Sequence, residues 1–303
     1  MRPTASHVTL QLRSKVLQAI RRFFVTRDFI EVETPVRLPA PALESFIDAV
    51  PSGDWYLRTS PELHMKRLLA VGMPRIFQMG ACFREGERGD HHSPEFTMLE
   101  WYRSDADYLT ILRDTEALIR EVADSVLGTG TFFFGNTTIH LATPWESISV
   151  SDAFRRFAGW DPVADFDPDR FDLDLINKVE PSLPLDRGVV LMDYPSEVAA
   201  LARRSERDPR VAERWELYLG GLELANAFSE LTDADEQRRR FEACAAERAA
   251  AGRDVYPLDY PFLAALEAGL PPCGGIALGV DRLTMLLANA PRIQDVIPFA
   301  MEM

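Results

Sequence analysis

Apolar residues recur at helical spacing near the N-terminus and predict an amphipathic helix over about residues 7–27. A short extended segment, Glu31 to Pro35, follows it. The run Thr59-Ser60-Pro61-Glu62 predicts the start of a second helix, because its ends have capping-box spacing and proline suits a first helical turn. We expect that helix to end at Gly72. The apolar face of the first helix is formed by Val16, Leu17, Ile20, Phe23 and Phe24.

Two segments with alternating character predict an antiparallel hairpin. In Ile76 to Arg84 the apolar residues share one face, which predicts a half-buried strand with Arg84 at the end of its more polar face. Glu95 to Tyr102 is the expected partner strand. The charged loop between them, Glu85 to Pro94, exceeds the roughly two to five residues usual in hairpins. Long loops of this kind are often functional.

A second hairpin is indicated where two glycines, residues 220–221, separate the strand-like segments 215–219 and 222–227. Neighbouring strands joined by hairpins, with helices before and after them, favour an α+β fold with an antiparallel sheet. We expect a single catalytic domain over residues 1–303, with about residues 150–210 as an insertion within it. Further elements are expected at 232–252 (helix), 276–278 (strand) and 281–290 (helix).

The second hairpin places two carboxylates together. A two-residue turn puts Tyr218 opposite Glu223 and Glu216 opposite Ala225, so that Glu216 and Glu223 point to one face of the sheet. Such a pair repels unless it is solvated or bridged by a cation, and Mg²⁺ commonly bridges carboxylates to phosphates. The alternative, a solvated polar face, stays open. The same register turns Asn226 away, so its participation would require a bend or bulge.

Composition excludes several classes of protein. The 303 residues carry 33 basic and 47 acidic side chains, a net charge of −14 with pI ≈ 4.9, which argues against a broad nucleic-acid surface. The sequence has no apolar run long enough to span a membrane and no secretory signal. Its three scattered cysteines are typical of a reduced compartment. We therefore expect a cytoplasmic protein that does not bind membranes.

The common nucleotide and zinc motifs are absent from the sequence. Gly274 to Gly279 does not have the spacing of a dinucleotide-binding loop, and no phosphate-binding G-x-x-x-x-G-K-[ST] run occurs. His91 and His92 are adjacent and have no third metal ligand nearby. We interpret them as a solvated pair in a loop.

Several motifs in order resemble class II aminoacyl-tRNA synthetases. Arg84 with the run Pro94–Glu100 resembles motif 2, Gly279–Arg282 resembles motif 3, and Glu33–Pro35 resembles motif 1. The resemblance covers nearly the whole chain and implies ATP-dependent ligation on an antiparallel sheet flanked by helices. Within the class, three stretches are similar to lysyl-tRNA synthetases, namely Thr59–Glu62, Phe96–Glu100 and Gly221–Leu231.

The position of motif 1 in the sequence indicates which family within the class the chain resembles. Its proline is already at Pro35, which leaves no room before it for the OB domain that binds the anticodon in lysyl-tRNA synthetases. A catalytic core of this kind resembles the bacterial elongation factor P lysine ligases. That family activates (R)-β-lysine, or less well α-lysine, and attaches it to a lysine side chain of elongation factor P. The resemblance also implies a homodimer and no stable binding of tRNA. Two alternatives are a truncated lysyl-tRNA synthetase and a non-catalytic sensor of lysine or nucleotide.

The resemblance implies a role for each site residue. Arg84 and Arg282 are the expected catalytic residues, and Glu216 and Glu223 the expected Mg²⁺ ligands. The sequence has Gly86 where the usual Arg-x-Glu of motif 2 has glutamate. We therefore expect Glu85 or Glu87 to make the contact near adenine that this glutamate makes in the family. The expected ATP-binding residues are Arg84, Glu85, Glu87, Ser93, Glu223, Leu224, Gly279 and Arg282. The expected lysine-binding residues are Ser60, Pro61, Glu62, Tyr102, Asn226, Glu230 and Ala277.

Two of these residues have a more specific expectation. Glu230 is the expected partner of the side-chain ammonium group of lysine. Ala277 stands where lysyl-tRNA synthetases usually carry glycine, and its methyl group would crowd the α-amino group of α-lysine more than the amine of β-lysine. Simple packing of a small residue between strand and helix is an equally good interpretation of Ala277.

Overall fold

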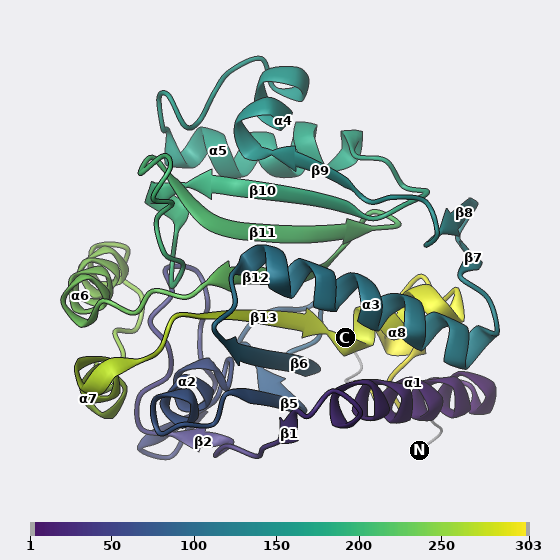
Figure 1. The fold of residues 1–303 in the computed structure, drawn as a ribbon, viewed down its shortest axis with the longest axis horizontal. Coiled ribbons are helices and arrows are strands. Elements are labelled where there is room, and N and C mark those ends of the chain that lie inside the picture. Colours follow the sequence, from purple (N-terminus) through teal and green to yellow (C-terminus); the bar gives the residue numbers. More distant parts are fainter. Residues whose placement is uncertain (1–3, 301–303) are drawn as a thin grey trace.

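The computed structural model describes residues 4–300 and is built on one large mixed sheet (Figure 1). Its eight strands lie in the order β1-β5-β6-β13-β12-β11-β10-β9. The outermost pairs, β1 with β5 and β10 with β9, are parallel, and all inner pairs are antiparallel. The strands are β1 (Ile30–Glu31), β5 (Arg75–Phe83), β6 (Glu95–Ser104), β9 (Glu146–Ser149), β10 (Val189–Pro195), β11 (Val211–Leu219), β12 (Leu222–Ser229) and β13 (Cys273–Gly279).

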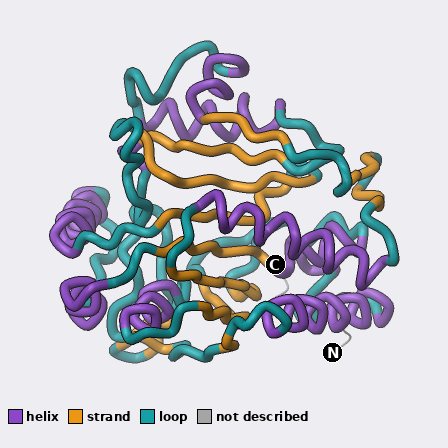
Figure 2. The backbone as a smooth tube through the Cα atoms, viewed as in Figure 1, coloured by secondary structure: helices purple, strands orange, loops and turns teal. Residues whose placement is uncertain are grey.

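Helices cover the sheet in three groups (Figure 2). Each group has its own apolar cluster. The largest cluster lies between the sheet and α1 (His7–Val25), α3 (Tyr108–Leu127) and α8 (Val280–Ala288). A second joins α2 (Glu62–Ala70), α6 (Ala234–Ala250) and α7 (Tyr260–Gly269), and a third joins α4 (Val150–Phe157) and α5 (Pro168–Asp174) to β10. Small ribbons β2 (Arg37–Leu38), β3 (Pro51–Ser52), β4 (Trp55–Leu57), β7 (Thr131–Phe134) and β8 (Thr137–His140) complete the fold.

The α+β prediction is confirmed, and both hairpins form where the alternation placed them. Residues 150–210 are not only peripheral, because they supply β10, which lies between β9 and β11 in the main sheet. The interpretation of residues 1–303 as one catalytic domain with an insertion stays a prediction. Among residues 4–300 no helix is long and apolar enough to cross a bilayer.

The predicted capping box at the start of α2 is wrong in its details. Thr59 Oγ1 is buried without a hydrogen-bond partner, and the backbone N–H of Glu62 is bound instead by Ser60 Oγ at 2.9 Å. The Glu62 carboxylate faces Lys66 rather than the helix start. The reason is that the Glu62 carboxylate belongs to a buried polar cluster, described below, in which its ion pair with Lys66 outweighs a local cap.

The predicted register of the second hairpin holds only next to its turn. Tyr218 pairs with Glu223 as expected, but the register then shifts and Glu216 pairs with Asn226 instead of Ala225. Leu224 is the extra residue, which makes this a β-bulge. The bulge is the bend that Asn226 needed in order to share a site with the carboxylates.

Candidate active site

A cavity of about 730 Å³ opens over the centre of the main sheet. Its walls come from the motif 2 loop, the hairpin β11–β12, helix α6, the start of α8 and the loop at residues 43–47. The structure brings together there most of the residues that were expected to bind ATP and metal. These are Arg84, Glu87, Ser93, Glu216, Glu223, Leu224, Gly279 and Arg282, joined by Asn226 and Ala277 from the expected lysine pocket. Glu85 is not among the lining residues.

The two arginines that were expected to be catalytic are held in different ways. Arg84 lies 5.2 Å over the ring of Phe96 and 3.5 Å from the Glu87 carboxylate, and its Nε is buried without a partner. Arg282 is fixed more firmly, because its Nη1 donates to the carbonyl oxygen of Glu223 at 2.7 Å. Both guanidinium groups therefore present positive charge to the cavity, which suits them to a polyphosphate.

The histidine pair also belongs to this wall. Both rings are exposed, but they are not simply solvated. His92 Nε2 lies 2.8 Å from Arg282 Nη2, and Arg282 Nε donates to the carbonyl oxygen of His91 at 3.3 Å. Partial burial against the cavity wall and the charge of Arg282 lower the pKa of His92, which favours a neutral ring facing the guanidinium. The pair therefore positions Arg282.

The acidic residue of motif 3 has a structural role. Asp281 is 2% exposed. It accepts hydrogen bonds from Arg13 Nη1 at 2.5 Å and from the backbone N–H of Thr97 at 2.7 Å. It thereby ties α1 and the motif 2 strand to the start of α8, directly beside Arg282.

The two expected metal ligands differ in how many hydrogen bonds their carboxylates already accept. Glu216 accepts hydrogen bonds from Arg214 at 2.5 Å, Tyr194 at 2.6 Å and Tyr218 at 2.8 Å. Glu223 is freer, with 43% of its side chain exposed and only a long contact of 3.4 Å to Arg282. Partial burial in the cavity wall, and then the charge of Glu216, raises the pKa of Glu223.

A cation between these two carboxylates would relieve their repulsion, so the donor set fits Mg²⁺ with Glu223 as the more available ligand. Among residues 4–300 no group of three or more His, Cys, Asp or Glu side chains forms a metal site by itself. Mg²⁺ in nucleotide enzymes commonly keeps phosphate oxygens and water among its ligands.

A buried polar cluster lies behind the cavity, around the start of α2. Ser60 Oγ and the Tyr102 hydroxyl donate to the two oxygens of Glu100 at 2.7 and 2.8 Å. Burial, then the charge of Glu62, raises the pKa of Glu100 to about 8. Of the expected lysine-binding residues, Ser60, Pro61, Glu62, Tyr102 and Glu230 belong to this region rather than to the cavity lining.

Lys66 is the member of this cluster that sequence reasoning missed. It is fully buried, and its Nζ lies 2.5 Å from both Glu62 Oε1 and Glu230 Oε2. Those two charges outweigh burial and raise the pKa of Lys66. One feature of the sequence does indicate this ion pair, because Glu62 and Lys66 are four residues apart in α2 and so lie on one face of the helix. That spacing is usually found on solvated helix surfaces, so it did not single out Lys66.

Glu230 remains incompletely satisfied. Apart from Lys66, its carboxylate has no polar partner in the described part of the chain, and it is 2% exposed. Burial raises its pKa to about 8 although Lys66 lowers it. Gly275 makes room for it, since a Cβ there would lie 2.2 Å from Glu230 Oε1 and 2.3 Å from the Tyr102 ring. Two residues further along β13, Ala277 lies opposite Asn226 on β12 and opposite Glu100 on β6.

The fold and these motifs agree with the comparisons. Residues 1–303 match the family described as tRNA synthetases class II (D, K and N), and the chain belongs to this family. Within it, the chain is 41% identical to the elongation factor P–(R)-beta-lysine ligase of Proteus mirabilis over 98% of its own length and 96% of that relative. The corresponding protein of Pectobacterium atrosepticum is 42% identical over 99% and 97%.

Lysine–tRNA ligases are also similar, but over a smaller share of their length. That of Actinobacillus pleuropneumoniae serotype 5b is 38% identical over 97% of this chain and 64% of the relative. The resemblance to elongation factor P lysine ligases drawn from the motifs is confirmed, as is the assignment of the chain as a ligase.

Proposed function

We propose that this protein activates lysine, with preference for (R)-β-lysine, as an aminoacyl-adenylate and transfers it to a lysine side chain of elongation factor P. The names and full-length similarity of its relatives support this function over a tRNA-charging one. The observation that carries the proposal is the charge of the buried cluster. With all three carboxyl groups ionised, Glu62, Glu100 and Glu230 against Lys66 leave a formal charge of −2. Because the pKa values of Glu100 and Glu230 are raised, a bound cation favours this ionised form.

That charge suits a diamino acid. Lysine and β-lysine each carry two ammonium groups, which together balance the cluster, whereas their carboxylate has to lie toward the cationic cavity. In this orientation Arg84 meets the α-phosphate and the attacking carboxylate, and Arg282 holds the polyphosphate tail. Formation of the adenylate then depends on positioning and on neutralising charge at the phosphate.

Mg²⁺, when bound by Glu223 and Glu216, would neutralise phosphate charge during this step. The residues of the protein do the remaining work. Arg214 and the hydroxyls of Tyr194 and Tyr218 hold the Glu216 carboxylate in place. The same site in a tRNA-charging enzyme would use the same first step, so only the acceptor distinguishes the two functions.

We further propose that the protein acts in the cytoplasm as a homodimer with no stable bound tRNA. Exposed apolar side chains flank motif 1, with Ile30 50% and Val36 43% exposed, and they suit an interface between two copies. Sedimentation of the purified protein tests the dimer.

Exchange of labelled pyrophosphate into ATP tests the activation step. We expect exchange that depends on lysine or (R)-β-lysine and on Mg²⁺, and none with other amino acids. Exchange with no amino acid at all would refute the dependence on lysine. Absence of exchange with either lysine would refute the proposed activation and favour a non-catalytic sensor.

A further inference from the structure

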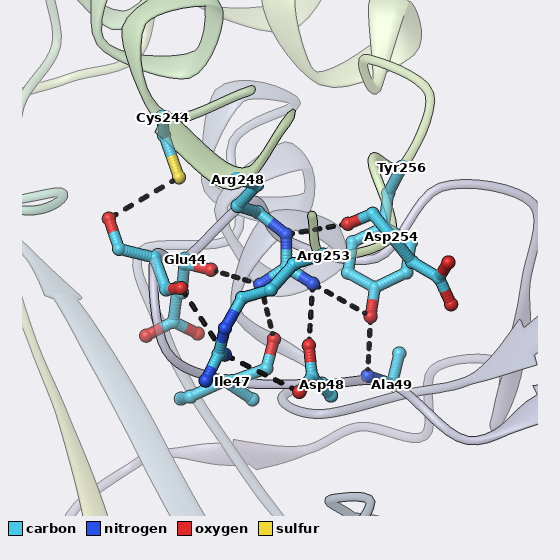
Figure 3. Close-up of polar contacts among 10 residues, drawn as sticks. Glu44, Ile47, Asp48, Ala49, Cys244, Arg248, Arg253, Asp254 and Tyr256 are labelled. Carbon is cyan, nitrogen blue, oxygen red and sulfur yellow. Dashed lines mark hydrogen bonds and ion pairs between the residues drawn. The ribbon is translucent and has the colours of Figure 1, made fainter. Parts of the chain in front are cut away.

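A buried arginine on α6 holds the loop at residues 44–49 against the body of the protein (Figure 3). Arg248 is 1% exposed. Its Nη1 donates to the carbonyl oxygens of Glu44 at 2.7 Å and Ile47 at 3.0 Å, and its Nη2 to Asp48 Oδ1 at 2.6 Å. Its other contacts are the Asp254 carbonyl and the Tyr256 hydroxyl. The backbone of this loop is therefore fixed at several points.

The loop forms one wall of the cavity and is joined to the motif 2 loop. The backbone N–H of Glu85 donates to the carbonyl oxygen of Asp48 at 2.8 Å. Glu44 and Phe46 line the cavity, and Phe46 is 75% exposed, so the loop reaches from the interior to the rim. This loop and Arg84 line the same cavity.

Glu44 carries a free carboxylate at this place. Within residues 4–300 its side chain has no hydrogen-bond or ion-pair partner, although its carbonyl oxygen is bound by Arg248. Burial raises its pKa, and the charges that act on it come from both halves of the site. Arg84 and Arg214 lower the pKa, whereas Glu62 and Glu87 raise it. Glu44 lines the same cavity as Arg84 and Arg214.

The transfer step requires a group of this kind. A lysine side chain of ordinary pKa is unprotonated in only about one molecule in 10³ at pH 7, and the ammonium form cannot attack a carbonyl carbon. Glu87 is paired with Arg84, and Glu216 and Glu223 are the expected Mg²⁺ ligands, whereas Glu44 has no role in the first step. We propose that Glu44 receives the ammonium group of the acceptor lysine and removes a proton from it, while Arg248 acts as the positioning residue.

The step balances without a further reactant. One proton passes from the acceptor ammonium to the Glu44 carboxylate, and the nitrogen lone pair forms a bond to the carbonyl carbon of the adenylate. The bond between that carbon and the phosphate oxygen breaks, and AMP leaves as an anion. The second proton of the nitrogen and the proton held by Glu44 then pass to water.

The inference rests on the proposed function, and single-turnover transfer separates the two. Enzyme loaded with lysyl-adenylate is mixed with elongation factor P, using the parent, Glu44→Gln and Glu44→Asp. Glu197→Gln is the matched control, because Glu197 lines the same cavity but is exposed and bonded only to Ser196. Pyrophosphate exchange on the same samples corrects for the amount of folded enzyme.

We expect Glu44→Gln to slow transfer about 10²-fold or more, as loss of a general base does, with partial recovery in Glu44→Asp and little change in Glu197→Gln. Hydroxylamine is already unprotonated at neutral pH, so with it as acceptor the gap between Glu44→Gln and the parent should close.

Equal transfer to elongation factor P by Glu44→Gln and parent would overturn this inference alone. An equal loss with hydroxylamine, or a matching rise in the KM for lysine, would also overturn it, because Glu44 would then act on the first substrate. Absence of transfer by the parent would overturn the proposed acceptor and this inference with it.

Discussion

Replacing Glu230 with glutamine tests how the buried cluster recognises a cationic substrate. The substitution preserves shape but removes the carboxylate that lies 2.5 Å from Lys66. Lys66 keeps its second partner, Glu62, at the same distance, so the helix retains one ion pair. The substrate, by contrast, loses the acidic group whose second oxygen has no other partner in the described residues.

The expected magnitude follows from the burial of Glu230. Removing one member of a buried, charged contact costs about 2–5 kcal/mol, which is roughly 30-fold to several thousand-fold in affinity. We expect the KM for lysine in pyrophosphate exchange to rise within this range, while the KM for ATP changes little because Glu230 lies outside the cavity lining.

The pH dependence supplies a second readout. Because burial raises the pKa of Glu230 to about 8, protonation of its carboxyl group competes with binding of an ammonium group near neutral pH. The KM of the parent for lysine should therefore fall as pH rises toward about 8, and Glu230→Gln should weaken that dependence. A variant with the lysine KM and pH profile of the parent would refute the assignment of Glu230 to the pocket.

Three further substitutions test separate parts of the site. Glu223→Ala should abolish lysine-dependent pyrophosphate exchange at saturating lysine and Mg²⁺, and near-normal exchange would show that Glu216 and Glu223 are only a solvated polar face. Ala277→Gly should improve kcat/KM for α-lysine relative to (R)-β-lysine by several-fold, since one methyl group is worth about 1–3 kcal/mol of discrimination; an unchanged ratio assigns Ala277 to packing. Arg248→Met should lower the free energy of unfolding in urea by about 3–5 kcal/mol because it leaves buried acceptors unpaired. The matched variant Arg253→Met should cost no more than about 1 kcal/mol, because the contacts of Arg253 are 3.4 Å long and partly exposed. Equal losses in the two variants would contradict this difference in burial.

The sheet and its hairpins could be predicted because alternation and glycine turns act locally. The register of β11 and β12 could be predicted only from the turn to Tyr218, since the bulge at Leu224 depends on packing across the sheet that no local pattern encodes. The same limit applies to the start of α2. Thr59 and Glu62 have capping-box spacing, but the Glu62 carboxylate forms an ion pair with the buried Lys66 instead of capping the helix.

The residues of the candidate site also differ in whether local sequence could locate them. Residues inside contiguous motifs, such as Arg84 and Arg282, could be located from the sequence, and they do line one cavity. Lys66 could not, because a charged residue in a short amphipathic helix normally faces water, whereas tertiary packing buries this one. Glu44 could not either, because it lies in a loop whose conformation depends on Arg248, about 200 residues away in the chain.

Transfer of label to elongation factor P in competition with tRNA tests the central claim most directly. Purified protein, ATP, Mg²⁺ and labelled (R)-β-lysine are incubated with equal amounts of elongation factor P and lysine-accepting tRNA, and the label in each acceptor is measured. The proposed function predicts stable label in elongation factor P, a gain in its mass of one lysyl residue, and none above background in tRNA. Label in tRNA with unmodified elongation factor P would contradict it.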